Sequence, residues 1–396
     1  MIDNPETIAT ELLQCLIQDK KPLGILLGAG CPYSIKDGTG KPLIPDICGL
    51  TDVVKSKISG GDCNESWLNI CKQFSDDFDS SPNIEWVLSR VRGLRDLVGT
   101  GQVRGLDKIK LENLETEICE VIKSCADKNL PDKLTPYHKL ASWIGAIDRS
   151  ESVEVFTPNY DLLAEQAFED LRLPYFDGFV GSSQPFFDPY AIDFDRLPPR
   201  WARLWKIHGS INWRSVMSEG SLKVWRSSVA EGGDVVIHPS HLKYEQSRKM
   251  PYLALMDRLR KFLSTPSAAL VIIGYSFRDQ HLNDVILQSL QGTPSAVAFA
   301  LMFGPLSSNE NGTCIAKNRA NLNLIAENGA IIRTKETFWK EVGEKPETDF
   351  PGIIDWTSDA GAASWKVRCN LGDFRCFGLF LQGIVGTKGQ RRQINE

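Results

Sequence analysis

The stretch Val155-Phe156-Thr157-Pro158-Asn159-Tyr160-Asp161 leads from an apolar run into polar residues, and a second apolar run leads into Lys206-Ile207-His208-Gly209-Ser210. Continuous apolar runs are typical of strands buried on both faces, as in a parallel sheet covered by helices. The carboxyl ends of such strands meet at one edge of the sheet, where ligands bind. We therefore expect Asn159 and His208 to lie side by side at that edge.

A third apolar run, Leu23 to Leu27, is followed directly by Gly28-Ala29-Gly30. A backbone without side chains can approach a pyrophosphate closely, and the amides of the following turn and helix are suitable donors. Many glycine-rich strand ends only make tight turns, so both interpretations stay open for this segment. It matches neither the G-x-G-x-x-G of dehydrogenases nor a P-loop.

Several apolar runs alternate with helical patterns along the chain. This alternation predicts an α/β fold with a Rossmann-like, doubly wound parallel sheet. The expected helices are Leu162–Leu171 and Asp279–Leu290. Asp279 begins the second of these and is expected to cap it rather than to act as a catalytic carboxylate. The expected strands are Leu23–Leu27, Val153–Phe156, Leu204–Ile207, Val235–Ile237, Ala269–Ile273, Ala296–Met302 and Ala330–Ile332.

We expect one catalytic domain over residues 1–345, interrupted by a helical module at about residues 47–150. In that module Trp86–Arg95 and Leu111–Lys123 have apolar residues at helical spacing. The irregular stretch Pro174 to Arg203 is expected to fold over the mouth of the pocket.

Residues 346–396 form a small C-terminal extension. Its aromatic runs Ala363–Val367 and Phe374–Phe380, broken by glycines, predict β-strands. The extension is a candidate oligomerisation element, and the sequence does not separate that role from a small core.

Bulk properties exclude several classes of protein. The net charge of −5 and the pI near 5.7 argue against a protein that coats nucleic acid or anionic membrane. The 10 cysteines contain no C-x-x-C pair, which indicates reduced thiols and a cytoplasmic protein. We expect no signal peptide and no membrane span. His238 and His241 flank Pro239 without a nearby Cys, so no metal site is expected.

The chain resembles the sirtuins, specifically the prokaryotic Sir2-like proteins, over roughly residues 23–345. Gly28-Ala29-Gly30 matches the Gly-Ala-Gly of the family, and Ile44-Pro45-Asp46 matches the start of its Ile-Pro-Asp element. Thr157-Pro158-Asn159-Tyr160-Asp161 is similar to its Thr-Gln-Asn-Ile-Asp. His208-Gly209 matches its catalytic His-Gly, and Gly274-Tyr275-Ser276 matches the Gly-Thr-Ser near the adenosine.

The resemblance implies that Asn159 and His208 are catalytic and that NAD is the substrate. The residues it implies for NAD binding are Gly28, Ala29, Gly30, Ser34, Asp46, Thr157, Asp161, Gly274 and Ser276. The chain departs from deacylating sirtuins because it lacks the two C-x-x-C pairs of their zinc ribbon. We therefore expect no zinc, and a groove for an acyl-lysine peptide is in doubt.

The run Gly274-Tyr275-Ser276-Phe277-Arg278-Asp279 resembles sirtuin-like NAD-hydrolysing effectors of bacterial antiphage defence. The resemblance implies an NAD glycohydrolase that yields nicotinamide and ADP-ribose, gated by homo-oligomerisation or by a partner such as a HerA-type ATPase. Two alternatives stay open: a zinc-free deacylase or ADP-ribosyltransferase, and a non-enzymatic sensor of NAD or ADP-ribose. The sequence leaves the oligomeric state, the trigger and the choice between NAD and NADP open.

Overall fold

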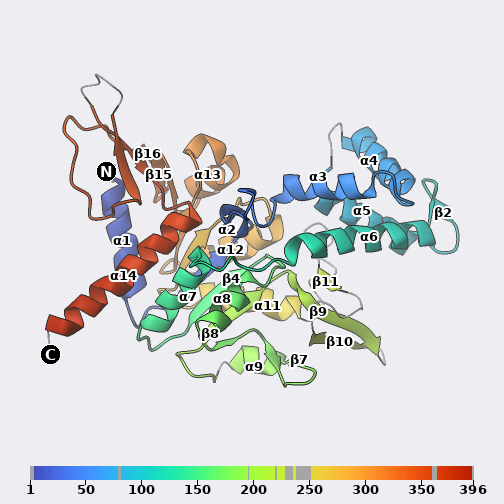
Figure 1. Cartoon of the computed structure of the whole chain (residues 1–396), viewed down its shortest axis with the longest axis horizontal. Coiled ribbons are helices and arrows are strands. Elements are labelled where there is room, and N and C mark those ends of the chain that lie inside the picture. The colour runs from blue at the N-terminus through green and yellow to red at the C-terminus, as the bar shows by residue number, and fades with distance from the viewer. Residues whose placement is uncertain are drawn as a thin grey trace.

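The computed structural model describes residues 4–78, 82–194, 196–218, 221–227, 235–237, 251–358 and 364–394. Its centre is a 9-stranded sheet in the order β16-β15-β14-β13-β12-β1-β4-β8-β5 (Figure 1). The strands are β1 Leu23–Leu27, β4 Val153–Thr157, β5 Tyr175–Phe176, β8 Ala202–Lys206, β12 Ala269–Ile273, β13 Val297–Leu301, β14 Leu322–Ala326, β15 Gly329–Ile332 and β16 Lys335–Phe338.

Six neighbouring strands, β8-β4-β1-β12-β13-β14, run parallel to one another. If these six strands are numbered by their order along the chain, they lie across the sheet as 3-2-1-4-5-6, which is the strand order of a Rossmann sheet. β5 adds a parallel strand beside β8, and β15 and β16 add antiparallel strands at the other edge. The predicted α/β, doubly wound sheet is confirmed, although Ala330–Ile332 lies in an antiparallel strand. The order reverses between β1 and β12, which makes this the crevice where such sheets bind ligands.

Different helices cover the two faces of the sheet. Successive side chains of a strand point to opposite faces, so each strand contributes to two separate cores. Leu23, Ile25 and Leu27 of β1 pack in a core with α1, α7, α8 and α14, whereas Leu26 packs in a core with α11 and α12. Gly24 leaves room for Phe262 of α11, which would come within 2.7 Å of an added Cβ. The helices are α1 Pro5–Ile17, α7 Pro136–Ala146, α8 Leu163–Asp170, α11 Tyr252–Leu263, α12 Gln280–Gly292, α13 Glu310–Lys317 and α14 Phe374–Ile394, with a 3-10 turn at Leu306–Ser308.

Between α2 (Gly30–Ser34) and α7 lies a helical module with a hydrophobic core of its own. It stands at the opposite end of the molecule from α1 and α14 (Figure 1). The helical insert predicted at about residues 47–150 ends at Ala126, because α7 packs in the main core instead. The module consists of α3 Ile47–Ile58, α4 Asn64–Phe78, α5 Ile84–Val98, the strands β2 Gln102–Val103 and β3 Leu106–Asp107, and α6 Lys108–Ala126.

A second sheet has the order β11-β9-β10-β7-β6, and its strand β9 begins directly after His208. Val235–Ile237 is a strand as predicted, but it pairs antiparallel with β9 and does not belong to the parallel sheet. The stretch from Pro174 to Arg203, predicted as irregular, contains short strands and a helical turn. The elements are β6 Phe179–Val180, β7 Phe186–Phe187, α9 Pro189–Phe194, β9 Gly209–Ser218, β10 Ser221–Arg226 and β11 Val235–Ile237.

The C-terminal extension differs from the predicted β-structure. Among the described residues of the extension, β17 (Ile354–Thr357) and β18 (Lys366–Cys369) pair as a hairpin, and the predicted strand Phe374–Phe380 is the start of the helix α14. Phe374 and Phe377 lie three positions apart on one helical face, and both are buried in the main core. The extension is thus not mainly β-structure, and it completes the core that covers one face of the large sheet.

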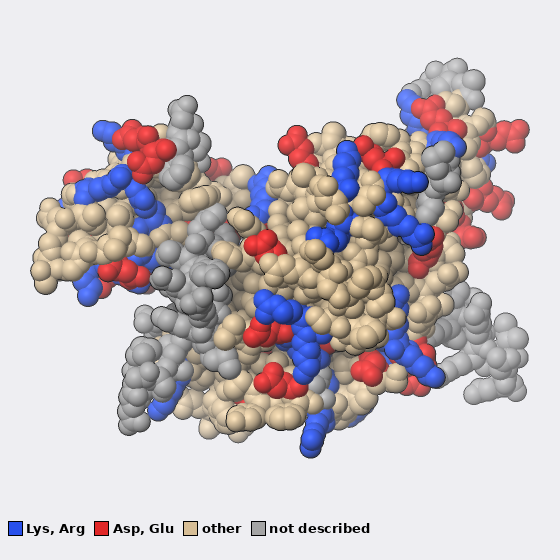
Figure 2. All heavy atoms as spheres, turned by 180° about the vertical axis from the view of Figure 1, so that it is seen from behind, with Lys and Arg blue, Asp and Glu red and all other residues tan. Residues whose placement is uncertain are grey.

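No helix among the described residues is long and apolar enough to cross a membrane. Figure 2 shows the face opposite to that of Figure 1, where acidic and basic side chains lie interspersed. Such a mixed face differs from the single basic surface that would hold a phosphate backbone.

Candidate functional site

The register of two parallel strands brings Asn159 and His208 together. Thr157 of β4 is paired with Lys206 of β8, so each candidate lies two residues beyond the last pair. The amide of Ile207 donates to the carbonyl oxygen of Thr157 at 2.8 Å, which keeps the two chains adjacent past that pair. The strand ends therefore place both predicted catalytic residues at the carboxyl edge of the sheet.

Two side chains tie the end of β4 to the end of β1. The hydroxyl of Thr157 donates to the carbonyl oxygen of Leu27 at 2.8 Å and accepts from the amide of Asn159 at 3.1 Å. The side-chain amide of Asn159 donates to the carbonyl oxygen of Gly28 at 3.1 Å. Asn159 is therefore held against the glycine turn, as a residue of a shared site would be.

The glycine turn packs against the segment that follows β12. The amides of Gly28 and Gly30 donate to the carbonyl oxygens of Ile273 and Gly274, at 2.9 and 2.8 Å. An added Cβ on Gly28 would lie 2.3 Å from the oxygen of Gly274, so these glycines are needed for contact between two backbones. These two amides are bound within the protein, and a role of the turn in holding a pyrophosphate stays a prediction. Ala29, between them, is exposed.

His208 forms a short polar contact with the carboxylate of Asp279. Its Nε2 lies 2.7 Å from Oδ2 of Asp279, and the two side chains are only 8% and 12% exposed. The bond joins the segments that follow β8 and β12, which are separated in the sheet by β1 and β4. Asp279 was expected to be a helix cap, and it is one, because its Oδ1 accepts from the amide of Leu282 at 3.2 Å. Its contact with His208 could not be read from the sequence.

The loop that carries Asp279 is held from within. The hydroxyl of Tyr275 lies 3.1 Å from the carbonyl oxygen of Asp279 and 2.8 Å from Oδ1 of Asn283, and its one hydrogen is shared between these two acceptors. The side-chain amide of Asn283 donates back to the carbonyl oxygen of Phe277 at 2.8 Å. Gly274 and Phe277 both have positive φ, 66° and 55°, and so turn the chain sharply on either side of the exposed Ser276.

A buried group of charges lies behind Asn159. Nζ of Lys206 contacts Oε1 of Glu165 at 2.9 Å and also donates to the main-chain carbonyl of Asp161. All three residues are less than one-tenth exposed. Burial raises the pKa of the Asp161 carboxyl to about 6, although Lys206 favours its charged form. Burial, together with Asp161, also raises the pKa of the Cys31 thiol and of the Tyr137 hydroxyl well above their usual ranges.

The helical module faces this edge of the sheet. Ile211, just after His208, is part of the core of the module, and Tyr160 packs against that core. Glu85 and Arg92 of α5 influence the Tyr160 hydroxyl, whose pKa is raised well above its usual value mainly by burial. The candidate site therefore lies where the module meets the sheet.

Two of the residues implied for NAD binding make local contacts, and their role toward NAD stays a prediction. Ser34 donates from its hydroxyl to the carbonyl oxygen of Cys31 at 2.7 Å. Asp46 is exposed and caps α3 by accepting from the amide of Gly49 at 2.9 Å. The structure brings together the glycine turn, Thr157, Asn159, Asp161 and Gly274.

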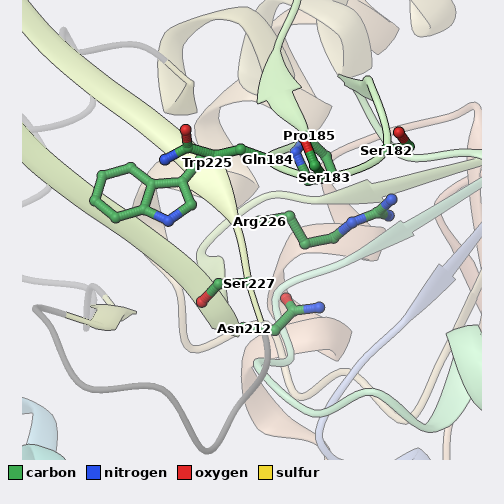
Figure 3. Close-up of a pocket in the computed structure, with 8 residues that line it drawn as sticks. All are labelled: Ser182, Ser183, Gln184, Pro185, Asn212, Trp225, Arg226 and Ser227. Atoms are coloured by element: carbon green, nitrogen blue, oxygen red, sulfur yellow. The ribbon is translucent and has the colours of Figure 1, made fainter.

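Three cavities of about 470–600 Å³ lie elsewhere in the described part of the chain, and neither Asn159 nor His208 lines them. Figure 3 shows the cavity of about 600 Å³, between the turn after β6 and the ends of β9 and β10. Its one cationic side chain, Arg226, is paired with Asp177 at 2.5 Å. Its lining residues are Ser182, Ser183, Gln184, Pro185, Asn212, Trp225, Arg226 and Ser227.

Within the described ranges no three His, Cys, Asp or Glu side chains gather as metal ligands. His238 and His241, from which no metal site was expected, lie outside those ranges.

A family model described as the SIR2-like domain matches residues 153–325. The matched part is similar to that family and contains Asn159, His208, Gly274 and Asp279, whereas the glycine turn of β1 lies before it. No curated protein matches the chain. Among 28 similar chains of solved structures is one described as "Structural Basis for the Mechanism and Regulation of Sir2 Enzymes". It is 12% identical, with 77% of this chain and 89% of that chain covered and a TM-score of 0.36, from which no residue correspondence follows.

Proposed function

We propose that this protein is an NAD glycohydrolase, which cleaves the bond between nicotinamide and ribose with water. The observation that carries the proposal is that Asn159, held by Gly28, and His208, held by Asp279, follow neighbouring strands at the carboxyl edge of a sheet in Rossmann order. The SIR2-like match over the same residues supports NAD as the ligand.

The reaction needs little beyond a positioned base. The bond between C1′ and the ring nitrogen breaks with its electron pair going to nicotinamide, water oxygen bonds to C1′, and one water proton must be removed. His208 accepts that proton, and a well-placed base contributes about 10²–10⁴-fold to the rate. Asn159 supplies a carboxamide that can hydrogen-bond to the ribose and to the water.

One structural feature favours water over an acyl-lysine as the acceptor. Directly after His208 the chain enters β9 of the second, antiparallel sheet. Deacylating sirtuins carry their zinc ribbon after this His, and the chain has no pair of C-x-x-C motifs to build one. A peptide groove that depends on that ribbon would therefore be incomplete.

The test is to incubate the purified protein with NAD and separate the products by chromatography. His208→Ala and Asn159→Ala should abolish turnover without unfolding, while Asp284→Asn, an exposed change on α12, should leave it unchanged. Nicotinamide and ADP-ribose formed without any peptide would support the hydrolase. Cleavage only with an acylated peptide or a protein acceptor would favour the transferase alternatives, and NAD bound but left intact, alone and with candidate partners, would favour the sensor.

We further propose that the activity serves as a gated effector of antiphage defence in the bacterial cytoplasm, with a homo-oligomer or a HerA-type ATPase as the gate. Cells that carry wild type or the His208→Ala variant would be challenged with phage while their NAD is measured. NAD should fall only in infected wild-type cells. If NAD level and phage yield do not differ between cells with wild type and cells with His208→Ala, the role in defence is rejected, whereas the proposed enzymatic activity is not.

A further inference from the structure

We propose that Asp279 is the positioning residue of His208: its carboxylate fixes which ring nitrogen carries the proton and leaves Nδ1 as the base. The inference rests on the proposed function, because it assigns the base of that reaction. It gives a role to a residue that the sequence presents only as a helix cap.

The two carboxylate oxygens of Asp279 have separate partners. Oδ1 accepts from the amide of Leu282 and so caps α12, whereas Oδ2 lies 2.7 Å from Nε2 of His208. A cap needs only the first of these bonds. The second joins residues 71 positions apart, and both side chains are nearly buried.

The loop geometry holds that second bond in place. Tyr275 donates to the carbonyl oxygen of Asp279 and is itself bonded to Asn283, which also binds the carbonyl oxygen of Phe277. These bonds fix the backbone at Asp279 relative to the first turns of α12. The carboxylate is therefore presented to His208 by a rigid loop.

The chemistry follows from the donor and acceptor properties of the groups. An ionised carboxylate only accepts hydrogen bonds, so Nε2 must carry the hydrogen, and a neutral ring then has its acceptor lone pair on Nδ1. When Nδ1 takes the proton released by water, the carboxylate stabilises the imidazolium that forms, as in other His–carboxylate pairs. An Asp at this position thus sets both the tautomer and the strength of the base.

Asp279→Asn separates the two roles, because Asn caps helices about as well as Asp but presents an amide or a neutral oxygen to His208. In this variant the side-chain amide would donate to Nε2 and move the proton to Nδ1. We expect turnover to fall about 10²–10⁴-fold, with KM and the melting temperature near those of wild type. Asp284→Asn, exposed on the same helix, is the matched control.

The tautomer itself is measured by nitrogen NMR of labelled protein at a pH where the ring is neutral, with the His208 signals assigned from His208→Gln. Protonated Nε2 in wild type and protonated Nδ1 in Asp279→Asn would support the proposal, also where the wild type itself does not cleave NAD. The same tautomer in both proteins, or undiminished turnover in the variant beside an active wild type, would overturn it. If Asp279→Asn does not fold, turnover and the His208 tautomer are measured in Asp279→Ser, which keeps a capping hydroxyl.

Discussion

The hydroxyl of Thr157 lies 2.8 Å from the carbonyl oxygen of Leu27 and joins the last residues of β4 and β1. Both residues are buried, and the same hydroxyl also accepts from the amide of Asn159. Thr157 therefore links the ends of two central strands to the position of a catalytic candidate.

Thr157→Val should keep the shape of the side chain but leave the carbonyl of Leu27 and the amide of Asn159 without this partner. We expect the free energy of unfolding to fall by about 1–3 kcal/mol, the cost of unsatisfied buried polar groups. Urea unfolding measures the change, and Thr157→Ser, which retains the hydroxyl, should lose less. A larger loss in Thr157→Ser than in Thr157→Val would mean that the methyl group, not the hydrogen bond, stabilises this edge.

The raised pKa of Asp161 predicts a specific pH dependence. With a pKa of about 6 in the folded protein against about 3.8 otherwise, the folded state binds this proton more tightly than the unfolded state does. The stabilisation is complete below about pH 3.8 and is lost as the pH rises through about 6, on the order of 3 kcal/mol in all. Asp161→Asn should remove this dependence.

The comparison is made by unfolding wild type and Asp161→Asn across that pH range and plotting the difference between them. Other titrating groups cancel in the difference, so the wild type should lose stability relative to the variant as the pH rises. A flat difference would show that Asp161 titrates at its usual pKa.

Glu154 anchors α11 to the sheet and should be costly to neutralise. Its carboxylate accepts two bonds from Arg258 and one from the indole of Trp205, all at 2.7 Å. Glu154→Gln would leave a largely buried guanidinium without its counter-charge, and we expect a loss of about 3–5 kcal/mol. Glu336→Gln, which breaks a partly exposed pair with Lys317, should cost at most about 1 kcal/mol in the same thermal or urea assay. Similar losses would argue against a special role for the buried pair.

The C-terminal helix should behave as part of the main core. Phe377 is fully buried between α14 and the rest of that core, whereas Leu379, two positions on, is 44% exposed. We expect Phe377→Ala to lower the free energy of unfolding by about 3–5 kcal/mol and Leu379→Ala to have a much smaller effect. A separate early unfolding transition in Phe377→Ala would instead mark the helix as an accessory element.

The strands Leu23–Leu27 and Ala269–Ile273 could be predicted to the residue, because each is a five-residue apolar run buried on both faces. The helix that begins at Phe374 could not be predicted because four glycines interrupt it and weaken the helical period. The converging strand ends predicted that Asn159 and His208 lie at one edge, and each follows the last pair of β4 and β8 by two residues. Their catalytic roles stay predictions.

The rest of the site depends on contacts that no local pattern encodes. The carboxylate of Asp279 meets His208 only after the chain has crossed to the other half of the sheet. Lys206 stands in an apolar run, and its partner Glu165 lies on a helix that shows no sign of it in sequence. Such pairs become visible only when distant segments are folded together.

The contact between Gly28 and Gly274 has a consequence for how this sequence can vary. Each glycine is required by the backbone of the opposite segment: a Cβ on Gly28 would meet the oxygen of Gly274, and one on Gly274 would meet the amide of Cys31 at 2.7 Å. A larger residue at one position cannot be accommodated by shrinking the other, since both are already glycine. The backbone contact between the two halves of the sheet therefore leaves no room for side chains at this point. Changes in which ligand is bound must come from the segments around it.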